Sequence, residues 1–161
     1  MKVRFLNECD FVNYKKPSMF IGAPTCDWKC ERESGCSGLC QNSALAKEPT
    51  IEISVRDIFN RYKNNPITNA VVIGGLEPMD SWDDLQALVQ YFRYYILDDI
   101  VIYTGYRQDE IQDKIKWLSL YENIIVKFGR YVPGGRPHRD EILGVDLASD
   151  NQYAEYIGER I

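Results

Sequence analysis

Short apolar runs alternate along this chain with stretches whose apolar residues recur at helical spacing. Four runs predict strands: 18–23, 70–73, 100–103 and 123–128. Continuous apolar runs of this kind are typical of strands that are buried on both faces of a parallel sheet. We therefore expect the four strands to form the centre of the fold.

The intervals between these runs predict helices. Ser54 and Ser81 each precede an apolar stripe and have an Asp three positions later, so both are expected to cap a helix. A further helix is predicted over 111–118 and a short one over 42–47, whereas 133–150 is rich in Gly, Pro and charge and predicts mostly loop. This alternation of strands and helices predicts an α/β fold with a mostly parallel sheet.

Three segments that follow predicted strands carry candidate chemistry. They are a cysteine-containing loop after Ala23, the segment Gly74-Gly75-Leu76-Glu77-Pro78, and Thr104-Gly105-Tyr106. The glycines allow a ligand to approach the backbone closely, and the carboxylate of Glu77 suits an ammonium group. Ligands of parallel sheets bind at the carboxyl ends of the strands, so we expect the three segments to converge on one site.

Four of the five cysteines lie close together in the polar loop after Ala23: Cys26, Cys30, Cys36 and Cys40. Thiolates at this density in a loop indicate one soft metal centre rather than packing. A structural zinc ion would use all four thiolates in a closed tetrahedral site. An iron–sulfur cluster would use three and leave one iron open to a ligand. The cysteine spacing by itself favours neither.

Length and charge narrow the class of protein further. The 161 residues predict a single domain over 1–161, and the net charge of −5 without a basic cluster argues against nucleic acid as a partner. No apolar run is long enough for a bilayer, and the N-terminus lacks a secretory signal, so we expect a cytoplasmic protein without a membrane partner. Thiols stay reduced in that compartment, which favours a metal site over disulfides.

Together these motifs resemble the radical S-adenosylmethionine enzymes. The three-residue gap between Cys26 and Cys30, the loop similar to Gly-Gly-Glu-Pro, and the βα pattern carry this general resemblance. Three further segments are similar, in order, to landmarks of the activating enzymes for anaerobic ribonucleotide reductases: 103–106, 123–131 and 148–152. The resemblance extends from about Phe11 to Ile157.

Two features depart from the family pattern. The second cysteine gap is larger than the two residues of the family, which leaves Cys40 or Cys36 as the third ligand. We favour Cys40 because the apolar Leu39 precedes it and Gln41-Asn42 follow it. The second departure is Leu76, which is inserted into the Gly-Gly-Glu-Pro loop.

The resemblance implies a compact partial (β/α)6-type radical-SAM barrel, with the cysteine loop after the first core strand. Cys26, Cys30 and Cys40 would bind a [4Fe–4S] cluster, with Cys36 as the alternative third ligand. S-adenosylmethionine would be bound by seven residues: Leu39, Asn42, Gly74, Gly75, Glu77, Tyr103 and Thr104. No side chain is assigned a catalytic role, and His138, the only histidine, is expected to lie in a solvated loop.

The implied activity is that of a radical SAM oxidoreductase. A 5′-deoxyadenosyl radical would abstract hydrogen from a glycine of an anaerobic ribonucleotide reductase or a related glycyl-radical enzyme. The implied partners are that large enzyme subunit and an electron donor of the flavodoxin or ferredoxin type. Lys127 and Arg130 either meet a carboxylate of the cofactor or partner, or lie at the surface. Two alternatives remain: a radical SAM enzyme acting on a deazapurine-type small molecule, and a zinc-stapled binding or adaptor module without catalysis.

Overall fold

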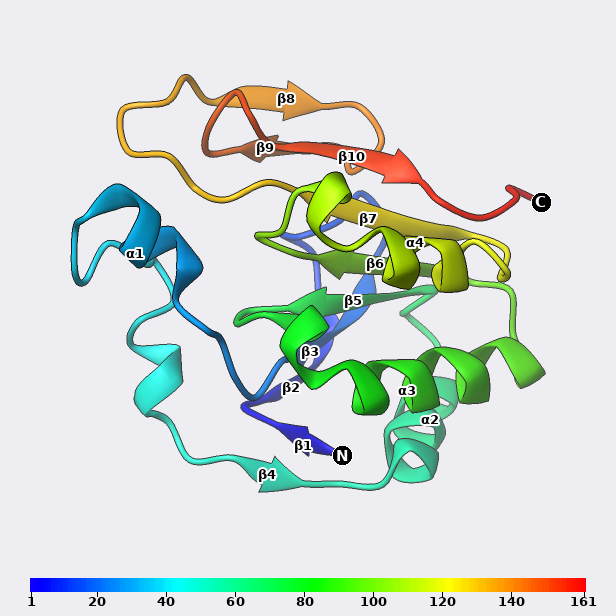
Figure 1. Ribbon diagram of the computed structural model, residues 1–161. Helices are drawn as coiled ribbons and strands as arrows, with labels where there is room; N and C mark the ends of the chain where they lie inside the picture. Colours follow the sequence, from blue (N-terminus) through cyan, green and yellow to red (C-terminus); the bar gives the residue numbers. More distant parts are fainter.

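The computed structural model describes residues 1–161 and contains a six-stranded mixed sheet (Figure 1). Its centre is formed by four parallel strands: β3 (Ser18–Gly22), β5 (Ala70–Gly74), β6 (Asp99–Tyr103) and β7 (Ile124–Phe128). Antiparallel strands lie at the two edges: β2 (Leu6–Asp10) beside β3, and β10 (Tyr153–Tyr156) beside β7. The four predicted strands are therefore confirmed, and the α/β class with them.

The parallel strands end in line with one another. Every residue of β5 and β7 is buried, as expected for strands covered on both faces. Gly22 is paired with Gly74, and the Ala23 N–H beyond β3 donates to the Gly74 carbonyl at 2.7 Å. The Thr104 N–H beyond β6 donates in the same way to the Lys127 carbonyl at 2.9 Å. The loops that follow these strands are thereby held at a common edge.

Three helices cover one face of the sheet (Figure 1). They are α2 (Val55–Asn64), α3 (Trp82–Tyr95) and α4 (Gln112–Leu118). Alternate strand residues, such as Ile73 and Ile102, meet the apolar stripes of these helices in the larger of two core clusters. Phe92 of α3 is 0% exposed in this core, with its ring centroid 5.2 Å from that of Phe59.

The two predicted helix caps have different outcomes. Ser54 caps α2 as expected, because its hydroxyl accepts a hydrogen bond of 3.0 Å from the Asp57 N–H. The prediction for Ser81 is wrong, because its side chain forms no such bond. A 3₁₀ turn, η2 (Pro78–Ser81), runs directly into α3, and Glu77 caps that turn by accepting from the Met79 N–H at 3.0 Å.

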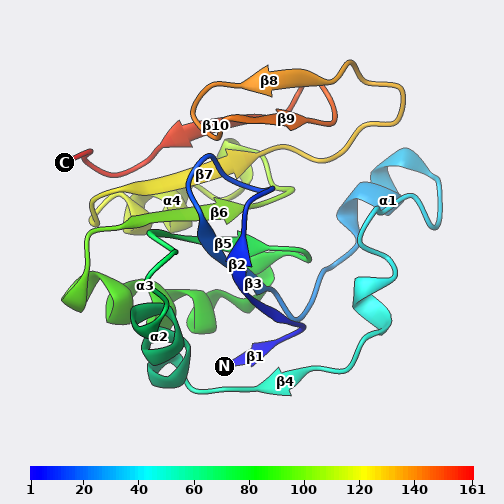
Figure 2. The same ribbon diagram turned by 180° about the vertical axis from the view of Figure 1, so that it is seen from behind.

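The second face of the sheet carries no helix. It is covered by the loop between β2 and β3 and by a hairpin of β8 (His138–Asp140) and β9 (Val145–Leu147) (Figure 2). The expectation of mostly loop over 133–150, with His138 in it, is therefore corrected. Asp140 organises this hairpin, because its carboxylate accepts from the N–H groups of Leu143 (2.8 Å) and Ala154 (2.9 Å).

Several short elements complete the chain. They are β1 (Lys2–Val3), α1 (Lys29–Ser34), β4 (Ile51–Glu52) and two 3₁₀ turns, η1 (Leu45–Lys47) and η3 (Gln108–Glu110). The helix predicted over 42–47 is limited to η1. Helix α1, inside the cysteine loop, was not predicted. None of the helices combines the length and the apolar character that a membrane crossing requires.

The parallel strands are connected in sequential order, by helices on one face of the sheet. Along the sheet, β3, β5, β6 and β7 occur in the order in which they occur in the chain, and the helices that connect them lie on one face. A doubly wound sheet, by contrast, reverses its strand order and places helices on both faces. The sheet is open, because β2 and β10 each pair on one side only.

Candidate metal centre and ligand cavity

A cavity of about 390 Å³ lies at the carboxyl ends of the parallel strands. Most of the predicted site residues line it: Cys26, Cys30, Leu39, Cys40, Asn42, Gly75, Glu77, Tyr103 and Thr104. Gly74 lies just behind this wall, at the end of β5. The three strand-end loops therefore meet at one cavity, although they are far apart in the sequence.

The four clustered cysteines differ in burial and in their position relative to the cavity. Cys26, Cys30 and Cys40 are half-buried, unpaired and line the cavity, whereas Cys36 is exposed and lies outside it. Burial raises the pKa of the Cys26 thiol to about 12. Burial, followed by the charge of Cys40, raises the pKa of Cys30. All three thiols line the same cavity, and binding of a metal there would replace their protons.

The backbone of the cysteine loop brings Cys40 back to the other two cysteines. Helix α1 begins after Trp28, which adopts a left-handed conformation (φ 59°, ψ 32°). The Asp27 N–H donates to the Asp80 carboxylate at 2.8 Å, which ties the start of the loop to η2. The Cys40 N–H donates to the carboxylate of Glu31 in α1 at 3.2 Å. No comparable bond holds Cys36 at the cavity; its N–H donates to the Ser34 hydroxyl.

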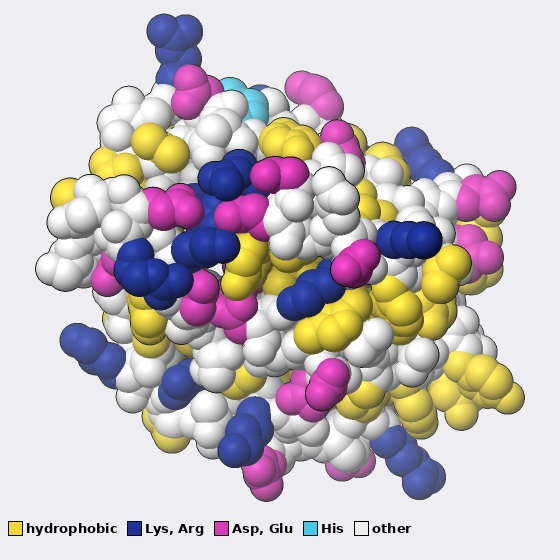
Figure 3. Space-filling model, viewed as in Figure 1, with side chains coloured by type: hydrophobic (Ala, Val, Ile, Leu, Met, Phe, Trp, Pro, Cys, Tyr) yellow, Lys and Arg dark blue, Asp and Glu magenta, His cyan; other side chains and the backbone are white.

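A charge network, which we call the Glu110 clamp, fastens α1 to the sheet. Glu110 accepts two hydrogen bonds of 2.8 Å from Arg130 and one of 3.0 Å from Lys29. The Nε of Arg130 lies 3.3 Å from the carboxylate of Glu33 in α1. The hydrogen bonds from Arg130 hold the pKa of Glu110 at about 2. Figure 3 shows basic and acidic side chains interspersed on the face where α1 meets the sheet.

Glu77 is the buried carboxylate of the cavity, 6% exposed. It accepts from the Thr104 hydroxyl (2.7 Å), the Gly105 N–H (2.8 Å) and the Met79 N–H (3.0 Å). Burial raises its pKa to about 7, and these hydrogen bonds oppose that shift. The carboxylate is therefore held in one orientation, and the inserted Leu76 packs beside it, 7% exposed, in the cavity wall.

Gly75 needs to be glycine. Its φ of +80° is unfavourable for residues with a side chain, and a Cβ would lie 2.8 Å from Cδ2 of Leu45. The backbone of the Gly74-Gly75 loop therefore packs closely against η1 and Phe5. Leu45 of η1 and Phe5 also line the cavity.

Lys127 lines the cavity, so the surface position that the sequence left open for it beside contact with a carboxylate is wrong. It lies in β7, 7% exposed, and its Nζ donates to the Gly129 carbonyl at 2.9 Å. Burial lowers its pKa to about 8. The available signal was a single charged residue inside the apolar run 123–128.

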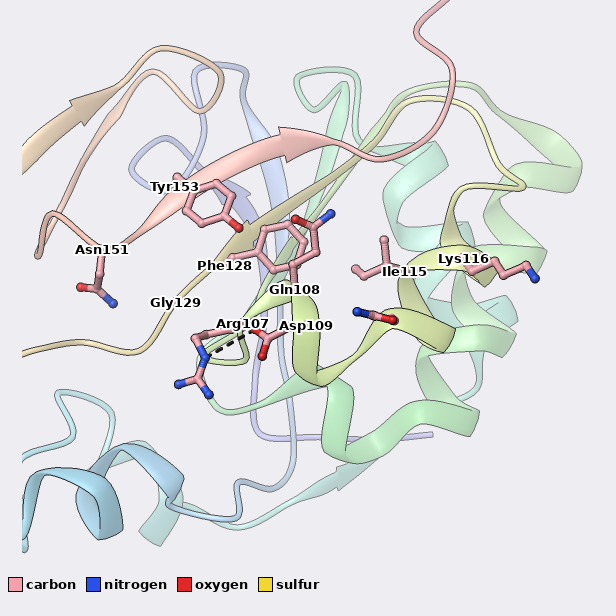
Figure 4. Close-up of a pocket in the computed structure, with 10 residues that line it drawn as sticks. Arg107, Gln108, Asp109, Ile115, Lys116, Phe128, Gly129, Asn151 and Tyr153 are labelled. Atoms are coloured by element: carbon pink, nitrogen blue, oxygen red, sulfur yellow. Dashed lines mark ion pairs between the residues drawn. The ribbon is translucent and has the colours of Figure 1, made fainter.

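A second cavity, of about 700 Å³, lies between η3, α4 and the ends of β7 and β10 (Figure 4). Arg107, Gln108, Lys116 and Tyr153 are among the side chains that line it. Figure 4 shows the ion pair of Arg107 with Asp109, whose charged atoms are 3.5 Å apart, at its edge. It contains no cysteine and none of the predicted site residues, so we place the candidate site in the cysteine cavity.

Residues 18–141 match the model of a family described as a 4Fe-4S single cluster domain. The match spans more than half of the chain, from β3 to β8, and the chain therefore belongs to this family. It is an iron–sulfur protein. No curated protein and no solved structure matches the chain.

The residues present fit a [4Fe–4S] cluster. Thiolates are the ligands that hold such clusters, and three of them line one cavity here. The zinc site of four thiolates that the sequence left open would also need Cys36, which is exposed outside the cavity. The donor set thus suits a cluster with one iron free of a protein thiolate.

Proposed function

We propose that this iron–sulfur protein is a radical SAM oxidoreductase that activates a glycyl-radical enzyme, with an anaerobic ribonucleotide reductase as the leading partner. The observation that carries the proposal is the division of the cysteines into three at the cavity and one outside it. A fourth thiolate would block the iron that S-adenosylmethionine needs.

In this proposal Cys26, Cys30 and Cys40 hold the cluster, and the strand-end loops hold S-adenosylmethionine. Glu77 faces the methionyl ammonium, beside the backbone of Gly74 and Gly75. Leu39, with Tyr103 or Thr104, lines the adenosine side, and Asn42 lies in the same cavity wall. The cavity of about 390 Å³ is in the range of sites that enclose small molecules.

Tyr103, the last residue of β6, and Thr104, which follows it, act differently from each other. The Tyr103 hydroxyl already donates to the Asn13 carbonyl at 2.6 Å, so its ring rather than its hydroxyl is available to the ligand. The Thr104 hydroxyl donates to Glu77 at 2.7 Å and accepts from the Tyr106 N–H at 3.0 Å. Thr104 is thus a positioning residue that orients the Glu77 carboxylate.

When bound, the reduced cluster would supply one electron that cleaves the sulfonium of S-adenosylmethionine into methionine and a 5′-deoxyadenosyl radical, which abstracts hydrogen from the substrate. The chain's own part is to orient the ligand and to exclude water. Glu77, Thr104 and Lys127 are all buried, so the methionyl end of the ligand would be held away from bulk solvent.

The proposal includes the partial radical-SAM barrel, the large glycyl-radical subunit and an electron donor of the flavodoxin or ferredoxin type. The sequential order of the parallel strands and the helices on one face support the barrel. The open sheet supports access of a protein substrate, because no further strands close the barrel beside β2 or β10.

Anaerobic reconstitution tests the proposal. The protein is loaded with iron and sulfide, reduced with dithionite and incubated with S-adenosylmethionine. We expect 5′-deoxyadenosine from the native protein and none from Cys30→Ser, and a glycyl radical signal by electron paramagnetic resonance when the partner enzyme is added. A brown, cluster-loaded protein that forms no 5′-deoxyadenosine above background contradicts the radical chemistry. Product without a glycyl signal contradicts only the partner.

A further inference from the structure

Asp80 is a charged residue beside the cysteine loop to which the proposed function gives no role. It lies in η2, and one of its carboxylate oxygens is within 4.8 Å of the Cys26 sulfur. Asp27 supplies another carboxylate oxygen within the same distance. Two acidic side chains, one from the cysteine loop and one from outside it, therefore lie beside the sulfur of one proposed cluster ligand.

The two carboxylates differ in their partners. Asp27 pairs with Arg32, whose guanidinium nitrogen lies 3.0 Å from the carboxylate. No basic side chain lies within 4.0 Å of the Asp80 carboxylate. Its hydrogen-bond donors are neutral: the Tyr106 hydroxyl at 2.7 Å and the Asp27 N–H at 2.8 Å. The charge of Asp80 therefore acts on its surroundings without a counter-ion.

Both oxygens of the Asp80 carboxylate are held in place. The Tyr106 hydroxyl donates to Oδ1, and the Asp27 N–H donates to Oδ2. Tyr106 is itself fixed at the end of β6, because its N–H donates to the Thr104 hydroxyl at 3.0 Å. The bond to Asp27 transmits this position to the start of the cysteine loop. Asp80 thus joins two strand-end loops and keeps its charge at a fixed place.

A fixed charge at this place affects the electron affinity of a cluster. The reduction potential of an iron–sulfur cluster depends on nearby charge and on hydrogen bonds to its sulfurs. A negative charge opposes the addition of an electron, so Asp80 lowers the potential. The Trp28 N–H, which donates to the Cys26 sulfur at 3.3 Å, acts in the opposite sense. Asp80 is exposed, so solvent screens part of its charge and the effect is moderate.

We propose that Asp80 is a positioning residue of the metal centre, which ties down the start of the cysteine loop through the Asp27 N–H and lowers the reduction potential of the cluster beside Cys26. The assignment rests on the cysteine ligand set of the proposed function and is independent of its radical chemistry. A lower potential makes the reduced cluster a stronger electron donor, as the reductive cleavage of a sulfonium requires.

A redox titration tests this assignment without a measurement of activity. Native protein and Asp80→Asn are loaded with iron and sulfide under nitrogen and titrated with dithionite in the presence of mediators. Electron paramagnetic resonance measures the reduced cluster. We expect the ratio of reduced to oxidised cluster at a fixed potential to rise at least threefold in Asp80→Asn, which corresponds to about 28 mV for one electron. Iron per chain should stay at the native level, because the amide oxygen can still accept from the Asp27 N–H.

Three further variants complete the experiment. Asp80→Ala removes the acceptor as well as the charge, so it should raise the ratio and also bind less iron than Asp80→Asn. Asp113→Asn makes the same chemical change at an exposed residue of α4 that does not line the cavity, and it should leave the ratio unchanged. Circular dichroism and iron content establish that Asp80→Asn is folded and loaded; if it is not, Asp80→Ser, which also lacks the charge, replaces it in the titration.

The outcomes separate the two proposals. If Asp80→Asn moves the ratio no more than Asp113→Asn does, the charge of Asp80 does not act on the cluster and the assignment is wrong, while the proposed function stands. If Cys26→Ser, loaded in parallel, binds as much iron as the native protein, the ligand set is wrong and the assignment falls with it. A shift in Asp80→Asn together with no 5′-deoxyadenosine from the loaded native protein supports the assignment and contradicts the radical chemistry.

Discussion

The carboxylate of Glu110 accepts hydrogen bonds of 2.8 Å from both terminal nitrogens of Arg130, 20 residues further along the chain. Arg130 follows β7, and Glu110 lies in η3, so the pair joins two loops at the same edge of the sheet. Through Lys29 and Glu33, the Glu110 clamp also reaches the helix that carries Cys30. The position of the metal ligands therefore depends on ion pairs outside the cysteine loop.

We predict that Glu110→Gln weakens both stability and cluster binding. The side chains of Glu110 and Arg130 are 14% and 7% exposed, so the substitution leaves the buried guanidinium with Glu33, whose side chain is 47% exposed, as its remaining anionic partner. The expected loss is about 3 kcal/mol in the free energy of unfolding, measured with urea on the metal-free protein. Iron per chain after reconstitution is expected to fall as well, because α1 is no longer fastened to the sheet.

Glu8→Gln is the matched control. Glu8 pairs with Arg61 at 3.3 Å, but the two side chains are 51% and 55% exposed. Exposed pairs of this kind contribute less than about 1 kcal/mol. Equal effects of Glu8→Gln and Glu110→Gln would show that the Glu110 clamp has no special structural role.

Cys40→Ala and Cys36→Ala are expected to differ sharply. Cys40 lines the cavity and its N–H is held by Glu31 at 3.2 Å, whereas Cys36 is exposed outside it. Cys40→Ala should therefore lose most of its iron and its visible absorbance after anaerobic reconstitution, and Cys36→Ala should keep both. The reverse result would make Cys36 the third ligand, and loss of metal from both variants would favour a site of four thiolates.

The two serines that precede α2 and α3 provide a matched pair for stability. Ser54→Ala removes the bond of 3.0 Å to the Asp57 N–H and is expected to lower the free energy of unfolding by about 1 kcal/mol. Ser81→Ala removes no cap bond, and its effect should stay within about 0.5 kcal/mol. Urea titrations of both variants measure this difference, which disappears if neither serine caps a helix in solution.

The sequence alone predicted the elements that are stabilised by residues close together in the chain. The runs 70–73 and 100–103 are continuously apolar, and a strand buried on both faces needs such a run. The helix after Ser54 has its cap and its apolar stripe within ten residues. Convergence of the strand-end loops could also be expected, because it is a property of parallel sheets rather than of particular side chains.

The elements that were missed depend on distant partners. Helix α1 has no buried residue and is held by ion pairs from Lys29 and Glu33 to residues far along the chain. The β8–β9 hairpin has the composition of a loop and is organised by the carboxylate of Asp140. The prediction that Ser81 caps α3 was wrong because a 3₁₀ turn that begins at Pro78 runs directly into the helix. The spacing of Ser81 and Asp84 does not distinguish this turn from the start of α3.

The pH dependence of stability reports directly on Glu77. Burial raises its pKa in the folded protein to about 7, above the ordinary value of 4.5 that it has when unfolded. Below pH 4.5 the carboxyl is protonated in both states and the burial of its charge has no effect. As the pH rises from 4.5 to 7 the unfolded state ionises first, so the folded state loses up to about 3 kcal/mol of relative stability.

Glu77→Gln removes this titration while it keeps the size of the side chain. The variant loses hydrogen bonds at every pH, so the informative quantity is the change with pH rather than the offset. We expect the stability of Glu77→Gln relative to the native protein to rise by about 3 kcal/mol between pH 4.5 and 7 in urea titrations of the metal-free protein. Glu52→Gln, at a side chain that is 80% exposed, is expected to show no such slope. A flat difference for Glu77→Gln would mean that the carboxylate is solvated in the metal-free protein and that its pKa is not raised by burial.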